Sequence, residues 1–277
     1  MKKLILAIPS NILEDSNTLQ DKTQKIGVIA RASSLFSVSE IFVYDIPHKK
    51  NDSVFITKIL KYLNTPPYLR KKIYSIQNDL KFAGILPPIK THSHVVPSKI
   101  HDVNVGDIRM GFAYVKSNIC YVDIGLKQDF ILRGQKINNK LILCRIDRLK
   151  SEFICSPADP TQLNNYWGYE VHRLNSLYKL INSSEYDYCI ITSRLGDSIE
   201  KHQKDFNSKL HNDRLLVVFG SPFVSVLDVV KKENIYLDDK KISTFNFFTD
   251  QKVETIRSEE AIMGCLSIIN YASKIQS

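Results

Sequence analysis

LILAIPSNILEDSNTLQDKTQKIGVIARASSLFSVSEIFVY, residues 4–44, is the stretch that decides the fold. Residues 4–8 are a short apolar run of strand length. Asn17 can cap the helix that the apolar spacing predicts over about residues 18–36. A second apolar run at residues 41–44 is the next strand. Strand, helix and strand within this length predict a parallel sheet with a right-handed crossover.

The second helix is expected over residues 54–63 and is stopped by Pro66-Pro67. The residue pattern of the sequence changes after it. Beyond Gly84, short apolar runs alternate with glycines and with the Asn138-Asn139 turn. Five short strands in this space predict a small closed barrel. An OB-like barrel is the economical choice, and a Greek-key insert with no binding role is the alternative. The expected strands cover residues 107–115, 119–124, 129–132, 141–146 and 152–155.

Helices and strands alternate again after the barrel. Apolar residues at helical spacing predict a helix over residues 162–181, and the last helix begins at Ser258. The fold class is therefore α/β: one parallel-sheet domain, residues 1–91 and 156–277, interrupted by a barrel at residues 92–155. Three further strands are expected at residues 188–192, 215–219 and 242–247.

The charge of the chain is strongly basic. Lys and Arg number 38 against 29 Asp and Glu, which gives a formal net charge of +9. The basic residues are dispersed along the chain, so a folded basic surface is expected rather than a charged tail. Such a surface suits a polyanionic partner, above all nucleic acid, and plain solubility is the alternative explanation.

Cysteine and histidine usage narrows the chemistry. The cysteines are odd in number, widely spaced and set among apolar residues, which predicts buried reduced thiols in a cytoplasmic protein. His92, His94 and His101 have no carboxylate or cysteine at ligand spacing, so no metal is expected. The apolar run at residues 4–8 is too short for a signal peptide or a membrane span, and no membrane association is expected. The cysteines are Cys120, Cys144, Cys155, Cys189 and Cys265.

Five stretches carry a family resemblance through their order along the chain. They are LAIP at residues 6–9 with IL at 12–13, GVIARA at 27–32, DLKFAGILPP at 79–88, YWGY at 166–169, and ETIRSEEA at 254–261. In that order, around an insert of this size, they resemble the SPOUT class of trefoil-knotted RNA methyltransferases. The subfamily resembled is the archaeal and eukaryotic one with an OB-like insert.

The resemblance implies a fold, a cofactor and an assembly. The C-terminal segment would thread through a loop to form a trefoil knot, and the knot loops would bind S-adenosylmethionine, largely through backbone groups. The active unit would be a homodimer, and the substrate ribosomal or transfer RNA. The cofactor-binding residues that it implies are Thr192, Phe219, Gly220, Ser221, Asn246, Gln251, Thr255 and Ile256.

Arg31 is the side chain to which the resemblance assigns catalysis. It lies four residues after Gly27, so both residues belong to one face of the predicted helix. A guanidinium there can hold a phosphate in bidentate fashion and stabilise developing negative charge. The alternative is a surface arginine paired with a carboxylate.

The glycines of the predicted knot loops depart from the family pattern. Gly220 alone remains where the family has several, and Thr249-Asp250-Gln251-Lys252 stands in place of a Pro-Gly-x-Gly segment. Glycines allow positive φ and close approach of a ligand, so their loss reshapes the pocket. Two functions therefore stay open. One is an S-adenosylmethionine-dependent RNA methyltransferase, and the other is a non-catalytic RNA-binding or ribonucleoprotein assembly protein on a degenerate SPOUT scaffold.

The predicted barrel carries candidate RNA contacts. Stacking aromatics and lysines in one groove are typical of single-strand binding. Because strand residues alternate between faces, about half of the candidates are expected in the core. The candidates are Phe112, Tyr114, Lys116, Tyr121 and Lys127.

Overall fold

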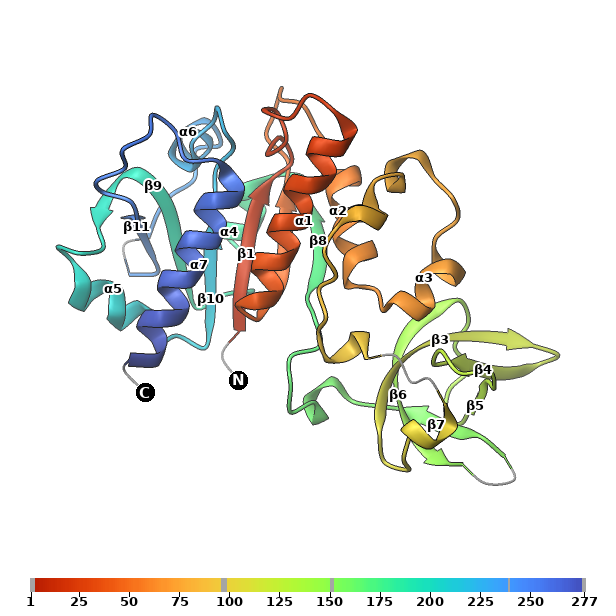
Figure 1. Ribbon diagram of the computed structural model, residues 1–277. Helices are drawn as coiled ribbons and strands as arrows, with labels where there is room; N and C mark the ends of the chain where they lie inside the picture. Colours follow the sequence, from red (N-terminus) through yellow and green to blue (C-terminus); the bar gives the residue numbers. More distant parts are fainter. Residues whose placement is uncertain (1–2, 96–98, 150–151, 239, 276–277) are drawn as a thin grey trace. The chain divides into compact units, whose positions relative to one another are not determined.

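The sheet begins as residues 4–44 predict. In the computed structural model, which describes residues 3–95, 99–149, 152–238 and 240–275, β1 (Lys3–Pro9) and β2 (Val38–Tyr44) pair in parallel. The helix α1 (Leu19–Leu35) joins the two strands (Figure 1). Residues 5–9 are all buried, because a parallel strand covered on both faces takes a continuous apolar run.

The N-cap of α1 differs by one residue from the prediction. Thr18, not Asn17, is the cap: its hydroxyl accepts from the backbone N–H of Asp21 at 3.0 Å. The Asp21 carboxylate accepts in return from the backbone N–H of Thr18 at 3.3 Å. This capping box satisfies two donors that the helix start leaves open. Because Asn and Thr are both good caps, the residue types alone did not separate the two positions.

The capping box makes a stability prediction. Thr18→Ala is expected to lower the free energy of unfolding by about 1 kcal/mol, because it removes an N-cap side chain. Asn17→Ala is the matched control and should leave stability unchanged. Urea denaturation followed by circular dichroism measures both. Equal losses in the two variants would mean that Thr18 is not the cap.

Six parallel strands complete the sheet in the order β11-β9-β10-β1-β2-β8. The strands β9 (Tyr188–Ser198), β10 (Arg214–Val218) and β11 (Ile242–Asn246) confirm the three strands expected late in the chain. No helix among the described residues is long and apolar enough to cross a membrane. The helical elements around the sheet are α2 (Ser53–Asn64), α4 (Leu177–Ile181), α5 (Gln203–Lys209), α6 (Val226–Lys232), α7 (Ser258–Ile275), η1 (Asn78–Leu80) and η2 (Ala83–Ile85).

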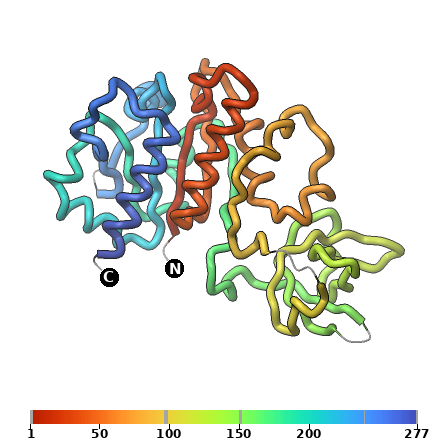
Figure 2. Tube along the Cα trace, viewed as in Figure 1, coloured from red at the N-terminus to blue at the C-terminus, as the bar shows by residue number. Residues whose placement is uncertain are grey.

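Different helices pack against the two faces of the sheet. Ile5 and Ala7 of β1 belong to a core shared with α4 and α6. Leu6 and Ile8 alternate with them and are also fully buried, so they point to the opposite face. The first and last long helices, α1 and α7, lie side by side (Figure 2). The C-terminal helix therefore packs against the N-terminal βαβ unit, although β11 before it lies at the far edge of the sheet.

The helix expected over residues 162–181 is wrong. The structure has η5 (Pro160–Gln162), the strand β8 (Glu170–Leu174) and only the short helix α4 there. Gly168 has a φ of +121°, which an α-helix does not contain. All five residues of β8 pair in parallel with residues 40–44 of β2. Tertiary pairing thus overrides a local apolar spacing that fits a helix and a strand alike.

Five strands form a closed barrel in the second unit of the chain, as predicted. The order is β3-β4-β5-β7-β6, with β5 and β7 parallel and the other pairs antiparallel. Ala113, Val122 and Phe130 are among its fully buried core residues. The strands are β3 (Ile108–Lys116), β4 (Ile119–Asp123), β5 (Phe130–Leu132), β6 (Lys140–Arg148) and β7 (Ile154–Pro157).

The structure divides the chain at other residues than the expected 92 and 155. The sheet unit holds residues 1–63, 78–87 and 169–277, and the barrel unit holds residues 64–77 and 88–168. The helix α3 (Pro67–Ile73) goes with the barrel because its Tyr68 donates a hydrogen bond to the Met110 carbonyl at 2.9 Å. The short helices η3 (His92–His94) and η4 (Ile100–Asp102) also belong to the barrel unit.

The aromatic residues of the barrel do not divide between core and surface as expected. Phe112, Tyr114 and Tyr121 all remain partly exposed, because the inward positions of β3 and β4 belong to smaller residues such as Ala113 and Val122. Tyr114 and Tyr121 are cross-strand partners, and their rings stack with centroids 5.9 Å apart. Lys116 and Lys127 are exposed. All five candidates thus lie outside the barrel core.

Candidate functional site

A cavity of about 660 Å³ lies at the carboxyl ends of β9, β10 and β11. Its wall comes from a bulge in β9, the loop after β10, the segment after β11 and the first turns of α7. The structure brings all eight predicted cofactor-binding residues into this wall, and Arg31 is not among the lining residues. The eight are Thr192, Phe219, Gly220, Ser221, Asn246, Gln251, Thr255 and Ile256.

The first wall segment is an interruption of β9. Its pairing with β11 runs to Ile191↔Thr244 and resumes at Asp197↔Phe245, so residues 192–196 are extra on β9 and form a bulge. The Thr192 hydroxyl donates to the Val218 carbonyl of β10 at 2.9 Å and fixes the start of the bulge. Where the bulge ends, a Cβ on Gly196 would lie 2.7 Å from the Thr244 carbonyl oxygen. The close approach of the two strands therefore requires glycine.

The second wall segment, residues 219–226, is a tight turn after β10. The Ser221 N–H donates to the Val224 carbonyl at 2.9 Å, and the Val224 N–H donates to the Ser221 hydroxyl at 3.1 Å. A Cβ on Gly220 would lie 2.8 Å from the same carbonyl oxygen. The turn thus needs glycine for its own backbone packing. Asn11, which follows β1 and is fully buried, donates to the Ser221 hydroxyl at 3.1 Å.

Side-chain amides hold the third wall segment, where the family pattern has glycines. The Asn246 amide donates to the Arg194 carbonyl at 3.1 Å and accepts from the Phe248 N–H at 3.0 Å. The Gln251 amide donates to the carbonyls of Val253 and Glu254 at 3.0 and 3.1 Å. The segment therefore has defined hydrogen bonds without the missing glycines.

The residues that line the cavity include few charged groups and one thiol. Arg194 is the single cation and Asp228 the single anion among the described residues that line it. Hydrogen bonds from Ser225, the N-cap of α6, lower the pKa of the Asp228 carboxyl. Burial raises the pKa of the Cys265 thiol, so this lining group stays protonated and is a poor nucleophile. The sequence did not single out Arg194, because the strand was expected to end at Thr192.

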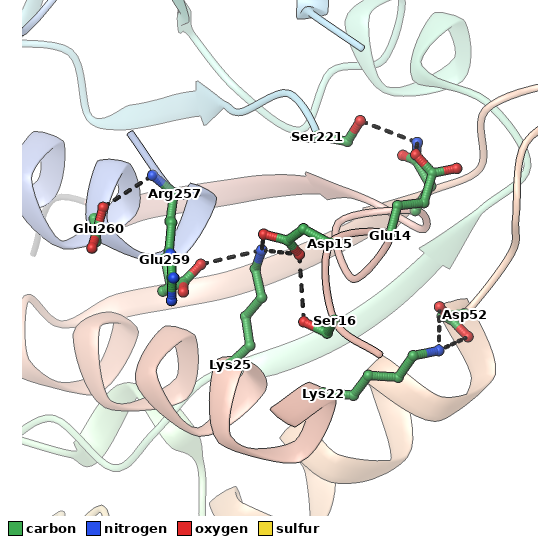
Figure 3. Close-up of polar contacts among 11 residues, drawn as sticks. Glu14, Asp15, Ser16, Lys22, Lys25, Asp52, Ser221, Arg257, Glu259 and Glu260 are labelled. Atoms are coloured by element: carbon green, nitrogen blue, oxygen red, sulfur yellow. Dashed lines mark hydrogen bonds and ion pairs between the residues drawn. The ribbon is translucent and has the colours of Figure 1, made fainter. Parts of the chain in front are cut away.

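A buried ion-pair triad braces the wall from behind (Figure 3). The Lys25 side chain is only 4% exposed, and its ammonium lies 2.7 Å from Asp15 and 3.2 Å from Glu259. It joins the loop after β1 and α1 to the first turn of α7. Because Ser258 and Cys265 of α7 line the cavity, the triad helps to set the position of that wall.

The structure also locates the other residues that the sequence analysis singled out. Arg31 is exposed, in the fourth turn of α1, between the exposed Val28 and Leu35 on the same face. The described cysteines are all buried and unpaired, which confirms the prediction of buried free thiols. His94 is buried, and its Nδ1 lies 2.7 Å from the Thr91 hydroxyl. No cluster of His, Cys, Asp and Glu that could hold a metal occurs in the part of the chain that the structure describes.

The arrangement defines a class of protein. A parallel α/β sheet with a cavity beyond the carboxyl ends of its strands is a small-molecule-binding fold. The volume lies within the ~300–1,000 Å³ typical of such sites.

Comparison with known proteins gives the family. The chain belongs to the family described as "Putative RNA methyltransferase", which it matches over residues 3–269. It is 26% identical to a 28S rRNA (uridine-N(3))-methyltransferase of Drosophila melanogaster, covering 96% of this chain and 61% of the relative. It is 28% identical to the mouse protein of the same name, covering 96% and 75%. An uncharacterized protein of Halobacterium salinarum is 23% identical over 94% of this chain and 95% of its own length. The chain thus spans about three fifths of the Drosophila relative.

Proposed function

We propose that the protein is an S-adenosylmethionine-dependent methyltransferase that acts on N3 of a uridine in ribosomal RNA. The observation that carries the proposal is the cavity at the ends of β9, β10 and β11, whose wall contains all eight residues expected to bind the cofactor. Membership of an RNA methyltransferase family and the names of the Drosophila and mouse relatives support the reaction and the substrate. The net charge of +9 suits an RNA partner.

The residues of the wall fit S-adenosylmethionine. The turn at Gly220 and residues 192–195 of the bulge border the cavity, beside apolar surface from Phe219 and Phe248. When bound, the cofactor supplies an electrophilic methyl group on a sulfonium centre. Methyl transfer is an in-line displacement, so the contribution of the chain is mainly to hold two reactants in line and to exclude water. The protonated Cys265 takes no nucleophilic role in this scheme.

The SPOUT knot, the OB-like barrel and the homodimer are parts of the same proposal. The crossing of α7 back to α1 from the edge strand β11 supports a threaded C-terminus. A closed barrel in which the third and fifth strands pair in parallel supports the OB-like assignment. Exposed apolar residues on the outer faces of α1 and α7 support a second copy as partner: Val28, Leu35, Tyr271 and Ile275. In such a dimer, Arg31 of one subunit would act at the cavity of the other.

The proposal is tested with the full chain, ribosomal RNA transcripts and tritiated S-adenosylmethionine. We expect cofactor binding by calorimetry and 3-methyluridine in the digested RNA. Arg31→Ala should lower methyl transfer by about 10²-fold, as for loss of one oxyanion-stabilising donor, and leave cofactor affinity within about threefold. RNA binding without any cofactor binding would contradict the proposal and favour the non-catalytic assembly protein.

A further inference from the structure

A hydrogen-bonded connection runs from the cavity wall to a carboxylate on another loop. The amide nitrogen of the fully buried Asn11 donates to the Ser221 hydroxyl at 3.1 Å and to the Glu14 carboxylate at 2.9 Å. Ser221 lines the cavity, and Figure 3 shows the Glu14 side chain near Ser221. One buried amide therefore fixes Glu14 relative to the predicted cofactor loop.

The loop that carries Glu14 is rigidly placed. Ile12 and Leu13 are fully buried under it. The Ile12 N–H donates to the Pro9 carbonyl and the Glu14 N–H to the Asn11 carbonyl, both at 3.1 Å. A half-buried carboxylate on such a turn keeps a fixed position, which a residue that exchanges a proton with a substrate requires.

Glu14 differs from the neighbouring carboxylates in its partners. Asp15 and Glu259 pair with the Lys25 ammonium, and Glu260 accepts from the Arg257 N–H at 3.0 Å. Those three carboxylates are therefore engaged in an ion pair or at the start of a helix. Glu14 has a neutral amide as its partner, and among the described residues its second carboxylate oxygen accepts no hydrogen bond.

Asn11 adds a second acceptor to the same place. Its Oδ1 atom is buried and accepts no hydrogen bond from any residue that the structure describes. Most buried acceptors in proteins are paired, and an unpaired one calls for an explanation, such as a donor that arrives with a ligand. The Asn11 amide oxygen and the free Glu14 oxygen are thus two unpaired acceptors next to Ser221, which lines the cavity while Asn11 and Glu14 themselves do not.

We propose that Glu14 removes the N3 proton of the target uridine and that Asn11 positions Glu14 against the cofactor loop, an inference that rests on the proposed function. The N3 nitrogen of uridine carries a hydrogen, and its lone pair is delocalised into the two flanking carbonyls. As the N3–H bond breaks, the proton passes to the Glu14 oxygen and the electron pair stays on N3. That pair is what an electrophilic methyl group needs for the new N–C bond.

Charged groups around Glu14 can influence how the rate of methyl transfer depends on pH. The charged side chains that Figure 3 draws together with Glu14 are Asp15, Lys22, Lys25, Asp52, Arg257, Glu259 and Glu260. Lys22 is paired with Asp52 at 3.0 Å and Lys25 with two carboxylates.

The test compares Glu14→Gln with the parent under single-turnover conditions, with Glu185→Gln as a control of equal charge change at an exposed position. We expect Glu14→Gln to lower the rate of methyl transfer by about 10²–10⁴-fold, the usual contribution of a general base. Its affinity for S-adenosylmethionine should stay within about threefold, which also reports correct folding. Glu185→Gln should match the parent.

Two further measurements separate proton removal from a purely structural role. RNA with 5-fluorouridine at the target has a more acidic N3, so it should restore most of the rate lost in Glu14→Gln and in Asn11→Ala. The single-turnover rate of Glu14→Gln should also rise steeply with pH, because the N3 proton must then leave to solvent, whereas the rate of the parent should depend less on pH. A parent-like rate in Glu14→Gln, or a loss that 5-fluorouridine leaves unchanged, overturns the inference while the proposed function stands. A parent that makes no 3-methyluridine overturns both.

Discussion

Valine in place of Gly220 is expected to weaken S-adenosylmethionine binding by about 10–100-fold while the sheet unit stays folded. A Cβ at this position would lie 2.8 Å from the Val224 carbonyl oxygen and 3.2 Å from the Val226 nitrogen. Both contacts are to backbone, which cannot rotate away as a side chain can. The turn at residues 219–226 must therefore shift, at a cost of ~1–3 kcal/mol for an overpacked site. Because that turn is cavity wall, the cost falls on binding.

Gly84 provides the matched control for this prediction. A Cβ there meets no atom within 4 Å, and the residue has no positive φ. Gly84→Val should keep the cofactor affinity of the parent in the same calorimetric titration. Unchanged affinity in Gly220→Val would show that the cofactor does not use this wall.

Local signals were enough for the elements that the sequence predicted well. Residues 5–9 are buried on both faces of the sheet, and a run of this kind identifies a parallel strand without knowledge of its neighbours. The barrel strands are separated by residues that tolerate positive φ, such as Gly125 at +88° and Asn139 at +51°. These residues mark strand ends through their own conformational preference.

Long-range pairing explains what the sequence left unpredicted. The strand β8 exists because β2 offers it a partner, and nothing in residues 170–174 alone excludes a helix. The β9 bulge is defined by its register against β11, which is a relation between two strands. The prediction that a strand ends at Thr192 was reasonable for the strand alone. It missed Arg194 because only the pairing carries β9 on to Ser198.

In the candidate site, too, some residues were predicted from local signals and others depend on long-range contacts. The eight wall residues were predicted because they follow strand ends and match the SPOUT pattern, and parallel strands bring their carboxyl ends to one edge. The link between Asn11 and Ser221 joins residues 210 positions apart, and no local pattern predicts it. The same holds for Lys25, which a surface helix would normally expose. Its burial follows from the packing of α7 on α1.

Lys25→Met is expected to lower the free energy of unfolding by about 3–5 kcal/mol, the range for breaking a buried ion pair from one side. Methionine fills a similar volume, so the loss comes from charge. Asp15 and Glu259 keep their negative charges at 27% and 15% side-chain exposure, and both lose the ammonium that lies 2.7 and 3.2 Å away. The first turn of α7 would then loosen, and with it the part of the cavity wall formed by Ser258. Cofactor affinity should fall together with stability.

The double variant Lys25→Met/Glu259→Gln distinguishes this electrostatic account from simple loss of packing. Removing the unpaired Glu259 charge should restore part of the stability lost in Lys25→Met, because residues in direct contact are energetically coupled. Lys3→Met is the control: Lys3 lies 3.5 Å from Glu40 with its side chain 56% exposed, and exposed pairs contribute only ~0–1 kcal/mol. Chemical denaturation of the four proteins and the parent gives all the differences on one scale, with Glu259→Gln completing the cycle. If the double variant is no more stable than Lys25→Met alone, the triad does not brace α7 through its charges, and the position of the helix depends on its apolar contacts with α1.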